Sequence, residues 1–273
     1  SHLIHNSDIT DAIVQIVENA PANLQLIFVS REIPQLSLGR LRVLNRVVEI
    51  GGDELRFRGL ETGNFLFLAG HTELSTDQIH TLEKHTEGWA AGLQLASISL
   101  LNREDIAKFI AAFSGSYRDV AEFLTEDVFR RQDDETREFL LQTSILDRLC
   151  PSLCNAITGR NNSRHMLDNL ESRSLFLFSL DDDREWYRYH NLFSDFLRKY
   201  LNTEIPNLAN ELHVRASEWF ASQNFIDEAI QHALAGKDME RAARFLNQAC
   251  DDLFYSGRLS TLAEWFKQIP ETH

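Results

Sequence analysis

The amino-acid sequence predicts a mainly α-helical protein with a small α/β remnant near its N-terminus. From Glu61 onward, apolar residues recur at helical spacing in one segment after another. Before that point, the continuous apolar run "LQLIFVSR" (24–31) is typical of a buried strand in a parallel sheet. Between 175 and 190, two runs of alternating apolar residues flank three aspartates, which indicates a β-hairpin.

The amino-acid composition excludes some classes of function. The chain has 273 residues, of which 43% are hydrophobic, enough for real cores and too many for a disordered chain. Lys and Arg number 27 against 41 Asp and Glu, a formal net charge of −14. Because affinity for duplex DNA depends on basic side chains, this balance argues against direct DNA contact by this chain.

Cysteine usage and hydropathy point to a cytoplasmic protein. The three cysteines form no C-x-x-C pair, which suits a reducing compartment better than a disulfide framework. No apolar run approaches the roughly 18 residues that a membrane span needs, and no signal peptide is visible. We therefore expect no membrane partner.

Residues 1–57 are predicted to be the C-terminal part of a larger α/β domain. A helix over 7–21 precedes the strand at 24–31, and "RVVEIGG" (46–52) reads as a second short strand. One helix and two strands cannot build a Rossmann-like or P-loop sheet, so we expect the larger part of that domain upstream.

The remaining chain divides into three helical parts: a helical domain at 58–116, a winged helix at 117–204 and a helical arm at 205–273. The winged helix is predicted from three helices, the hairpin and a closing helix. The predicted helices are 61–70, 75–86, 87–101, 105–113, 118–131, 133–149, 151–158, 163–172, a helix after the hairpin, and four in the arm.

The arm carries a weak internal repeat. Glu218-Trp219-Phe220 recurs as Glu264-Trp265-Phe266, which agrees with stacked helix hairpins of the tetratricopeptide kind. Aromatic residues at helical spacing are usually core, so we expect both Trp-Phe pairs to pack inside. Two aspartate clusters, at 133–134 and 181–183, are expected to be caps or turns, and no metal site is predicted.

Three blocks of the sequence resemble one family. They are "HTEGWAAGLQLASISL" (85–100), "YRYHNLFSDFLR" (187–198) and "ASEWFASQNFIDEAIQHALAGKDMERAARFL" (216–246). Together and in this order they are similar to the maltose-activator-type, large ATP-binding LuxR-family regulators of the STAND class of signal-transduction ATPases. That family carries a P-loop domain, a helical domain, a winged helix, an arm, a repeat-built sensor and a DNA-binding helix-turn-helix. The resemblance places residues 1–57 just beyond the Walker B aspartates.

The resemblance also implies a function. The full-length protein would rest as a monomer with bound ADP, and a small-molecule inducer with ATP and Mg would open it to self-associate. DNA would be bound only through a C-terminal module beyond this chain. No G-x-x-x-x-G-K-[ST] motif occurs here, so the chain is not expected to be an enzyme by itself, and the full-length protein would be a slow regulatory ATPase.

His190 is the first candidate binding residue. It lies where the aromatic strand of the hairpin meets an amphipathic helix. The resemblance implies that it contacts the β-phosphate of ADP and locks the resting state, which a ring N–H at a helix N-terminus can do. The alternative is a structural histidine bonded to a backbone carbonyl across the hairpin.

Arg31, Pro34 and Gly88 complete the predicted nucleotide site. Arg31 ends the apolar run at 24–31, where the resemblance implies a sensor arginine; the alternative is a surface ion pair with Glu32 or Glu49. Pro34 would line the adenine pocket. Gly88 would bring backbone close to the nucleotide, although Ala90 stands where related ATPases have proline. Its alternative is a helix-opening turn with Trp89 in the core.

Two rival functions remain. One is a helical-repeat scaffold that binds a protein or peptide and no nucleotide. The other is an enzyme that lacks its catalytic half, although no nucleophile–His–acid spacing is present. A Walker A loop in the upstream sequence would exclude the scaffold.

Overall fold

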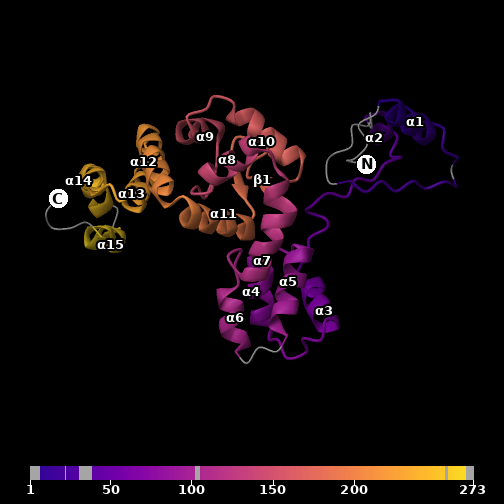
Figure 1. The fold of residues 1–273 in the computed structure, drawn as a ribbon, viewed down its shortest axis with the longest axis horizontal. Helices are drawn as coiled ribbons and strands as arrows, with labels where there is room; N and C mark the ends of the chain where they lie inside the picture. The colour runs from indigo at the N-terminus through magenta and orange to yellow at the C-terminus, as the bar shows by residue number, and fades with distance from the viewer. Residues whose placement is uncertain (1–6, 22, 31–38, 102–104, 256–257, 269–273) are drawn as a thin grey trace. The chain divides into compact units, whose positions relative to one another are not determined.

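The structure is a computed structural model that describes residues 7–21, 23–30, 39–101, 105–255 and 258–268 (Figure 1). It contains two compact units, which are described separately. One comprises Ser1–Ala111 with Asp168–Leu177, and the other comprises Ala112–Leu167 with Phe178–His273. The prediction of a mainly α-helical fold is confirmed.

The N-terminal segment contains α1 (Ser7–Glu18) and the short α2 (Gly39–Val43). The two strands predicted at 24–31 and 46–52 are wrong within the described residues, because neither run is assigned to a strand. Ile27 and Val29 are 80% and 82% exposed. A strand needs a neighbouring strand along its length, and the only two strands among the described residues lie in the hairpin.

The helices of the first unit follow the predicted periodicity. They are α3 (Leu60–Leu68), α4 (Thr76–Thr86), α5 (Ala90–Leu100) and α6 (Ile106–Ala112), the last of which ends one residue into the second unit. Ser75 caps α4 in a capping box with Gln78. His71 lies buried after α3, and its Nε2 lies 3.0 Å from the Ser97 hydroxyl of α5. Helices α3, α4 and α5 pack on one another.

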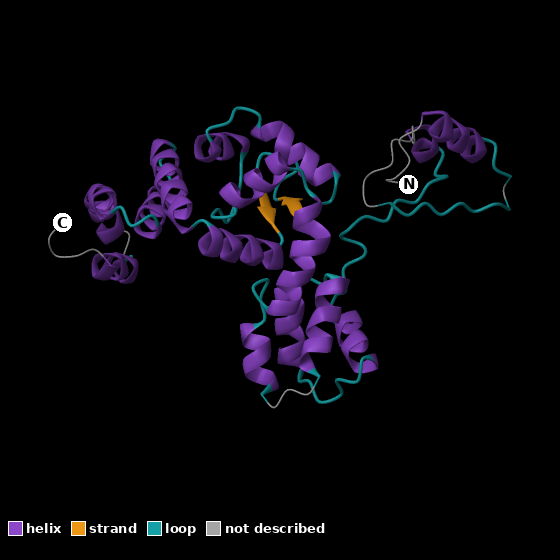
Figure 2. Cartoon of the chain, in the orientation of Figure 1, coloured by secondary structure: helices purple, strands orange, loops and turns teal. Residues whose placement is uncertain are grey.

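The winged helix begins with α7 (Arg118–Phe123), which continues as a π-helical turn (Leu124–Val128) and a 3₁₀ turn (Phe129–Arg131). Then follow α8 (Asp134–Thr143), α9 (Pro151–Thr158), α10 (Ser163–Ser172), β1 (Leu177–Ser179), β2 (Tyr187–Tyr189) and α11 (Asn191–Glu204). Figure 2 shows β1 and β2 side by side among these helices.

The helix predicted over 133–149 is too long. It ends at Thr143 because Leu149 instead pairs antiparallel with Tyr187 of β2, with N···O distances of 2.7 and 2.8 Å. Leu149 is fully buried in this extended position. Its helical spacing from Ile145 was therefore compatible with a strand register that only the tertiary structure selects.

The two aspartate clusters act as predicted. Asp133 caps α8 by accepting a hydrogen bond from the Thr136 N–H at 2.8 Å. Asp181 accepts hydrogen bonds from the backbone N–H groups of Glu185 and Trp186, which closes the hairpin turn. Within the described ranges, no group of three or more His, Cys, Asp or Glu residues is placed to hold a metal.

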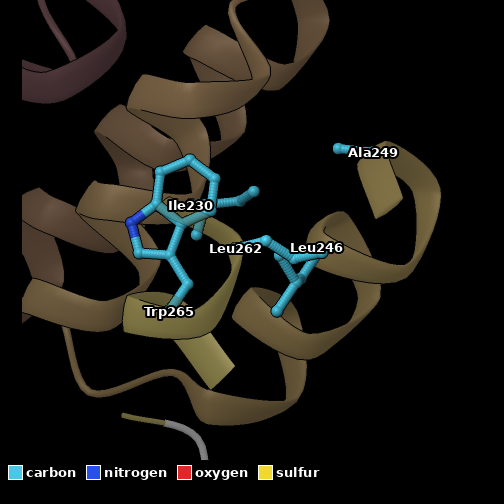
Figure 3. Packing of buried hydrophobic residues seen from close by; sticks show 5 residues of the cluster. All are labelled: Ile230, Leu246, Ala249, Leu262 and Trp265. Carbon is cyan, nitrogen blue, oxygen red and sulfur yellow. The ribbon is translucent and has the colours of Figure 1, made fainter. Parts of the chain in front are cut away.

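The arm consists of α12 (Pro206–Ser222), α13 (Ile226–Ala235), α14 (Met239–Tyr255) and α15 (Leu259–Gln268), each packed on the one before it. Figure 3 shows the apolar cluster that joins α13, α14 and α15, in which the Trp265 indole lies beside Ile230. Trp265 and Phe220 are buried as predicted, but Phe266 is 49% exposed, so the prediction for that residue is wrong.

The cysteines are free thiols, with Cys150 and Cys154 buried. Burial raises the pKa of the Cys154 thiol. None of the described helices is long and apolar enough to cross a membrane.

Candidate functional site

His190 occupies the junction between β2 and α11 and is only 2% exposed. Its ring is the N-cap of α11, because Nδ1 accepts a hydrogen bond from the Leu192 N–H at 3.2 Å. In the neutral ring an accepting Nδ1 requires that Nε2 carry the proton. The far edge of the imidazole is therefore a hydrogen-bond donor.

Nδ1 of His190 caps the helix that the residue itself opens. The alternative of a bond from this histidine to a backbone carbonyl across the hairpin stays a prediction. The backbone carbonyl of His190 accepts from the Ser194 N–H at 2.9 Å, so both the ring and the main chain are fixed to the first turn of α11.

The surrounding residues hold the ring in place. The Phe178 ring, adjoining it from β1, lies 6.2 Å away between centroids. Next to it, the Tyr189 hydroxyl lies 2.7 Å from the Thr143 hydroxyl, and burial raises the pKa of Tyr189. Phe193 packs edge-on against Tyr189. His190 itself is only 2% exposed, which leaves the imidazole little freedom to change rotamer.

Gly88 lies in the other unit, where the local backbone structure by itself requires a glycine. Its φ is +70°, and a Cβ there would lie 2.2 Å from the Phe57 carbonyl oxygen. The Phe57 N–H donates to the Gly88 carbonyl at 2.9 Å, and Arg56 pairs with Glu87 at 3.4 Å beside it. The missing side chain thus accommodates the protein's own backbone, and the nucleotide contact stays a prediction.

The structure does not bring the four predicted residues together. Arg31 and Pro34 lie outside the described residues, and Gly88 and His190 belong to different units. Glu49, one of the partners suggested in the alternative for Arg31, forms an ion pair with Arg42 at 2.6 Å. Trp89, expected in the core, is partly buried and packs edge-on against Phe176.

Sequence reasoning missed an arginine that joins the winged helix to the arm. The Arg148 guanidinium lies 4.6 Å from the Trp186 ring centroid and 5.1 Å from that of Phe225, and it donates to Glu228 at 2.7 Å. A second bond runs from Arg215 of α12 to the Ile157 carbonyl at 2.8 Å. Only the aromatic character of residues 186 and 225 hinted at this joint.

Comparison with known proteins agrees with the arrangement of the hairpin and α11 described above. The family described as the MalT winged helix domain matches residues 125–209, which include the hairpin, His190 and all of α11. The chain is MalT-like. It is 33% identical over 271 residues to the HTH-type transcriptional regulator MalT of Klebsiella pneumoniae subsp. pneumoniae, a match that covers 98% of this chain and 30% of that protein.

A second relative is a protein kinase by name. The MalT-like chain is 36% identical over 269 residues to the serine/threonine-protein kinase PknK of Mycobacterium tuberculosis, covering 98% of this chain and 24% of the kinase. The chain thus spans about a quarter to a third of the length of these relatives. The MalT-type winged helix places it in a regulatory family of the transcription-factor type.

Proposed function

We propose that this chain is the regulatory portion of an adenine-nucleotide-controlled transcriptional activator of the LuxR family. In this proposal the winged helix latches the ADP-bound resting state and His190 is the latch. The observation that carries it is the position of the imidazole at the N-cap of α11, where Nδ1 accepts a hydrogen bond from the Leu192 N–H and the proton of the neutral ring is therefore on Nε2.

The chemistry of that donor suits a phosphate. A ring N–H next to the first turn of a helix adds to the partial positive charge of the helix N-terminus, and both favour an anion. Helix α11 has 14 residues, so its dipole is fully developed. Since the residue is buried, a bond from Nε2 to a phosphate oxygen would be little weakened by water.

The latch would work by shifting a population. ADP would stabilise the closed state if His190 and residues of the nucleotide-binding domain, Arg31 among them, bond one ligand only when the domains are docked. ATP with Mg and an inducer would favour the open, self-associating state. The relative MalT is by name an HTH-type transcriptional regulator, which supports this output.

The winged helix itself is not proposed to read DNA. Its hairpin turn carries three consecutive aspartates, Asp181 to Asp183, and the whole chain has a formal net charge of −14. A wing of this charge repels phosphate backbones. DNA contact is assigned to a module outside this chain, and the chain alone is expected to show neither ATPase activity nor operator binding.

The decisive experiment separates capping from ligand binding. His190→Asn in the full-length protein keeps a side chain that accepts from the Leu192 N–H but removes the Nε2 donor. We expect ADP to dissociate about tenfold faster, corresponding to the loss of one charge-assisted bond of roughly 1.5 kcal/mol, and basal activation to rise. His165→Asn, at an exposed position of α10, is the control. Unchanged ADP release together with wild-type basal activity would remove His190 from this role.

A second candidate function is a helical-repeat scaffold for another protein. The observation that favours it is the exposure of aromatic side chains on α14 and α15, namely Phe254, Tyr255 and Phe266. One measurement distinguishes the two functions, because a scaffold would bind no adenine nucleotide at any stage of purification. Nucleotide released from the denatured full-length protein and identified by chromatography decides between them.

A further inference from the structure

Residues 113–117, "FSGSY", form the linker between α6 and α7 and run against the start of α11. At Gly115 the contact is between main chains. A Cβ on this residue would lie 1.6 Å from the Leu192 carbonyl oxygen, 2.5 Å from the Leu192 carbonyl carbon and 2.9 Å from its Cα. Any side chain would have to move the linker or the first turn of α11 by more than 1 Å, because backbone atoms cannot rotate away.

A second attachment lies two turns further along α11. The Lys199 ammonium donates to the Ser116 carbonyl at 2.9 Å. Within the linker, the Ser114 and Ser116 hydroxyls lie 2.8 Å apart, and Phe113 is buried with its ring 5.9 Å from that of Tyr117. The linker is therefore fixed to α11 at both Leu192 and Lys199.

Leu192 connects this linker to His190. Its N–H donates to His190 Nδ1, and its carbonyl oxygen is the atom against which Gly115 lies. The N–H and carbonyl belong to one residue of the first turn, so a displacement that relieves contact at the carbonyl also alters the bond that orients the imidazole.

We propose that Gly115 is a positioning residue for His190, and that the linker seats the imidazole by fixing the first turn of α11. The regulatory meaning rests on the proposed function: a strain applied to the linker from the helical domain would release the latch. The positioning itself can be tested without any nucleotide.

The test is Gly115→Ala in the 273-residue chain, read by the ¹⁵N resonances of the histidine rings. In the wild type, His190 should give an unprotonated, hydrogen-bonded Nδ1 and a protonated Nε2. In Gly115→Ala these resonances should shift toward the mixed tautomers of an exposed histidine. Gly63→Ala is the matched control, because a Cβ there meets nothing closer than 3.8 Å, and it should leave the His190 signals unchanged.

A milder variant covers the case in which Gly115→Ala does not fold. Lys199→Met removes the second attachment without any backbone overlap, because its side chain is of similar length and has no donor for the Ser116 carbonyl, and hydrogen exchange at the Leu192 amide should become several-fold faster. Unaltered His190 ring signals in a folded Gly115→Ala protein, or unaltered Leu192 exchange in Lys199→Met, would overturn the proposal. If the ring signals move but ADP release from full-length Gly115→Ala does not, the positioning stands and the latch function of His190 fails.

Discussion

His213 of α12 and His232 of α13 form a half-buried imidazole pair in the arm, with their Nδ1 atoms 2.9 Å apart. One ring must donate and the other accept, so the bond requires that at least one ring stay neutral at Nδ1. The Phe220 ring stacks on His232 at 5.2 Å. The pKa of both rings is lowered from 6.5 to about 4, chiefly by burial; Arg198 adds to the lowering of both, His213 adds to that of His232, and Asp147 opposes it.

The sign of the pH effect follows from these values. Each folded-state pKa lies below the unfolded one, so the unfolded chain binds more protons between about pH 6.5 and about pH 4. Stability should therefore be insensitive to these rings above about pH 7 and fall as the pH drops through that window. Between about pH 7.5 and about pH 5.5, linkage gives a loss of about 1 kcal/mol for each ring and about 2–3 kcal/mol for the pair.

The assay is urea denaturation of the wild type and of the double variant His213→Gln/His232→Gln at these two pH values. Both values lie above the isoelectric point of about 5.1, where the protein should stay soluble. All other titrating groups contribute equally to the two proteins and cancel in the difference. His165→Gln, an exposed histidine, is the control and should match the wild type.

The wild type should lose about 2–3 kcal/mol more than the double variant on acidification. Equal losses in the two proteins would refute the reasoning, because they would mean that the rings titrate alike in the folded and unfolded chains.

Three further outcomes are expected. Gly88→Ala should lower the melting temperature of the helical domain by several degrees, since it combines a φ of +70° with a 2.2 Å overlap, whereas Gly63→Ala should not; calorimetry compares them. Trp265→Ala should destabilise α15 by about 3 kcal/mol and speed its amide exchange, while the neighbouring Phe266→Ala should change stability by less than about 0.5 kcal/mol. Arg148→Ala should cost about 1–2 kcal/mol in urea denaturation, because it loses cation–π contacts and a partly exposed ion pair; an unchanged midpoint would show that the joint contributes nothing.

Much of the fold could be predicted because helix periodicity is local. The helices predicted at 151–158 and 163–172 have these bounds in the structure, since apolar stripes and caps lie within each segment. Asp133 and Asp181 were assigned to a cap and a turn for the same reason: their hydrogen bonds reach only a few residues along the chain.

The strands were harder because pairing is not local. Leu149 fits a helix by spacing but is extended, since it pairs with Tyr187, which lies 38 residues later in the chain. The run at 24–31 has a strand composition without a strand among its described residues. Phe266 fits the aromatic repeat, but which of two adjacent rings enters the core depends on how α15 rotates against its neighbours.

In the candidate site, too, some features could be predicted from the sequence and others depended on the tertiary structure. His190 could be singled out from its place between a hairpin and a helix, but the nitrogen it uses for capping depends on the geometry of the first turn. Gly115 could not be singled out from the sequence, because no residue close to it in the chain indicates that the Leu192 carbonyl lies against its backbone.

By itself, then, the order of residues determined which segments are helical, where they begin, and that the surface is acidic, since all of these depend on neighbours a few positions apart. Only tertiary structure decided the β-bridge between Leu149 and Tyr187, the paired imidazoles and the contact that orients His190. Each of these joins groups far apart in the chain, and their meeting depends on how whole helices pack.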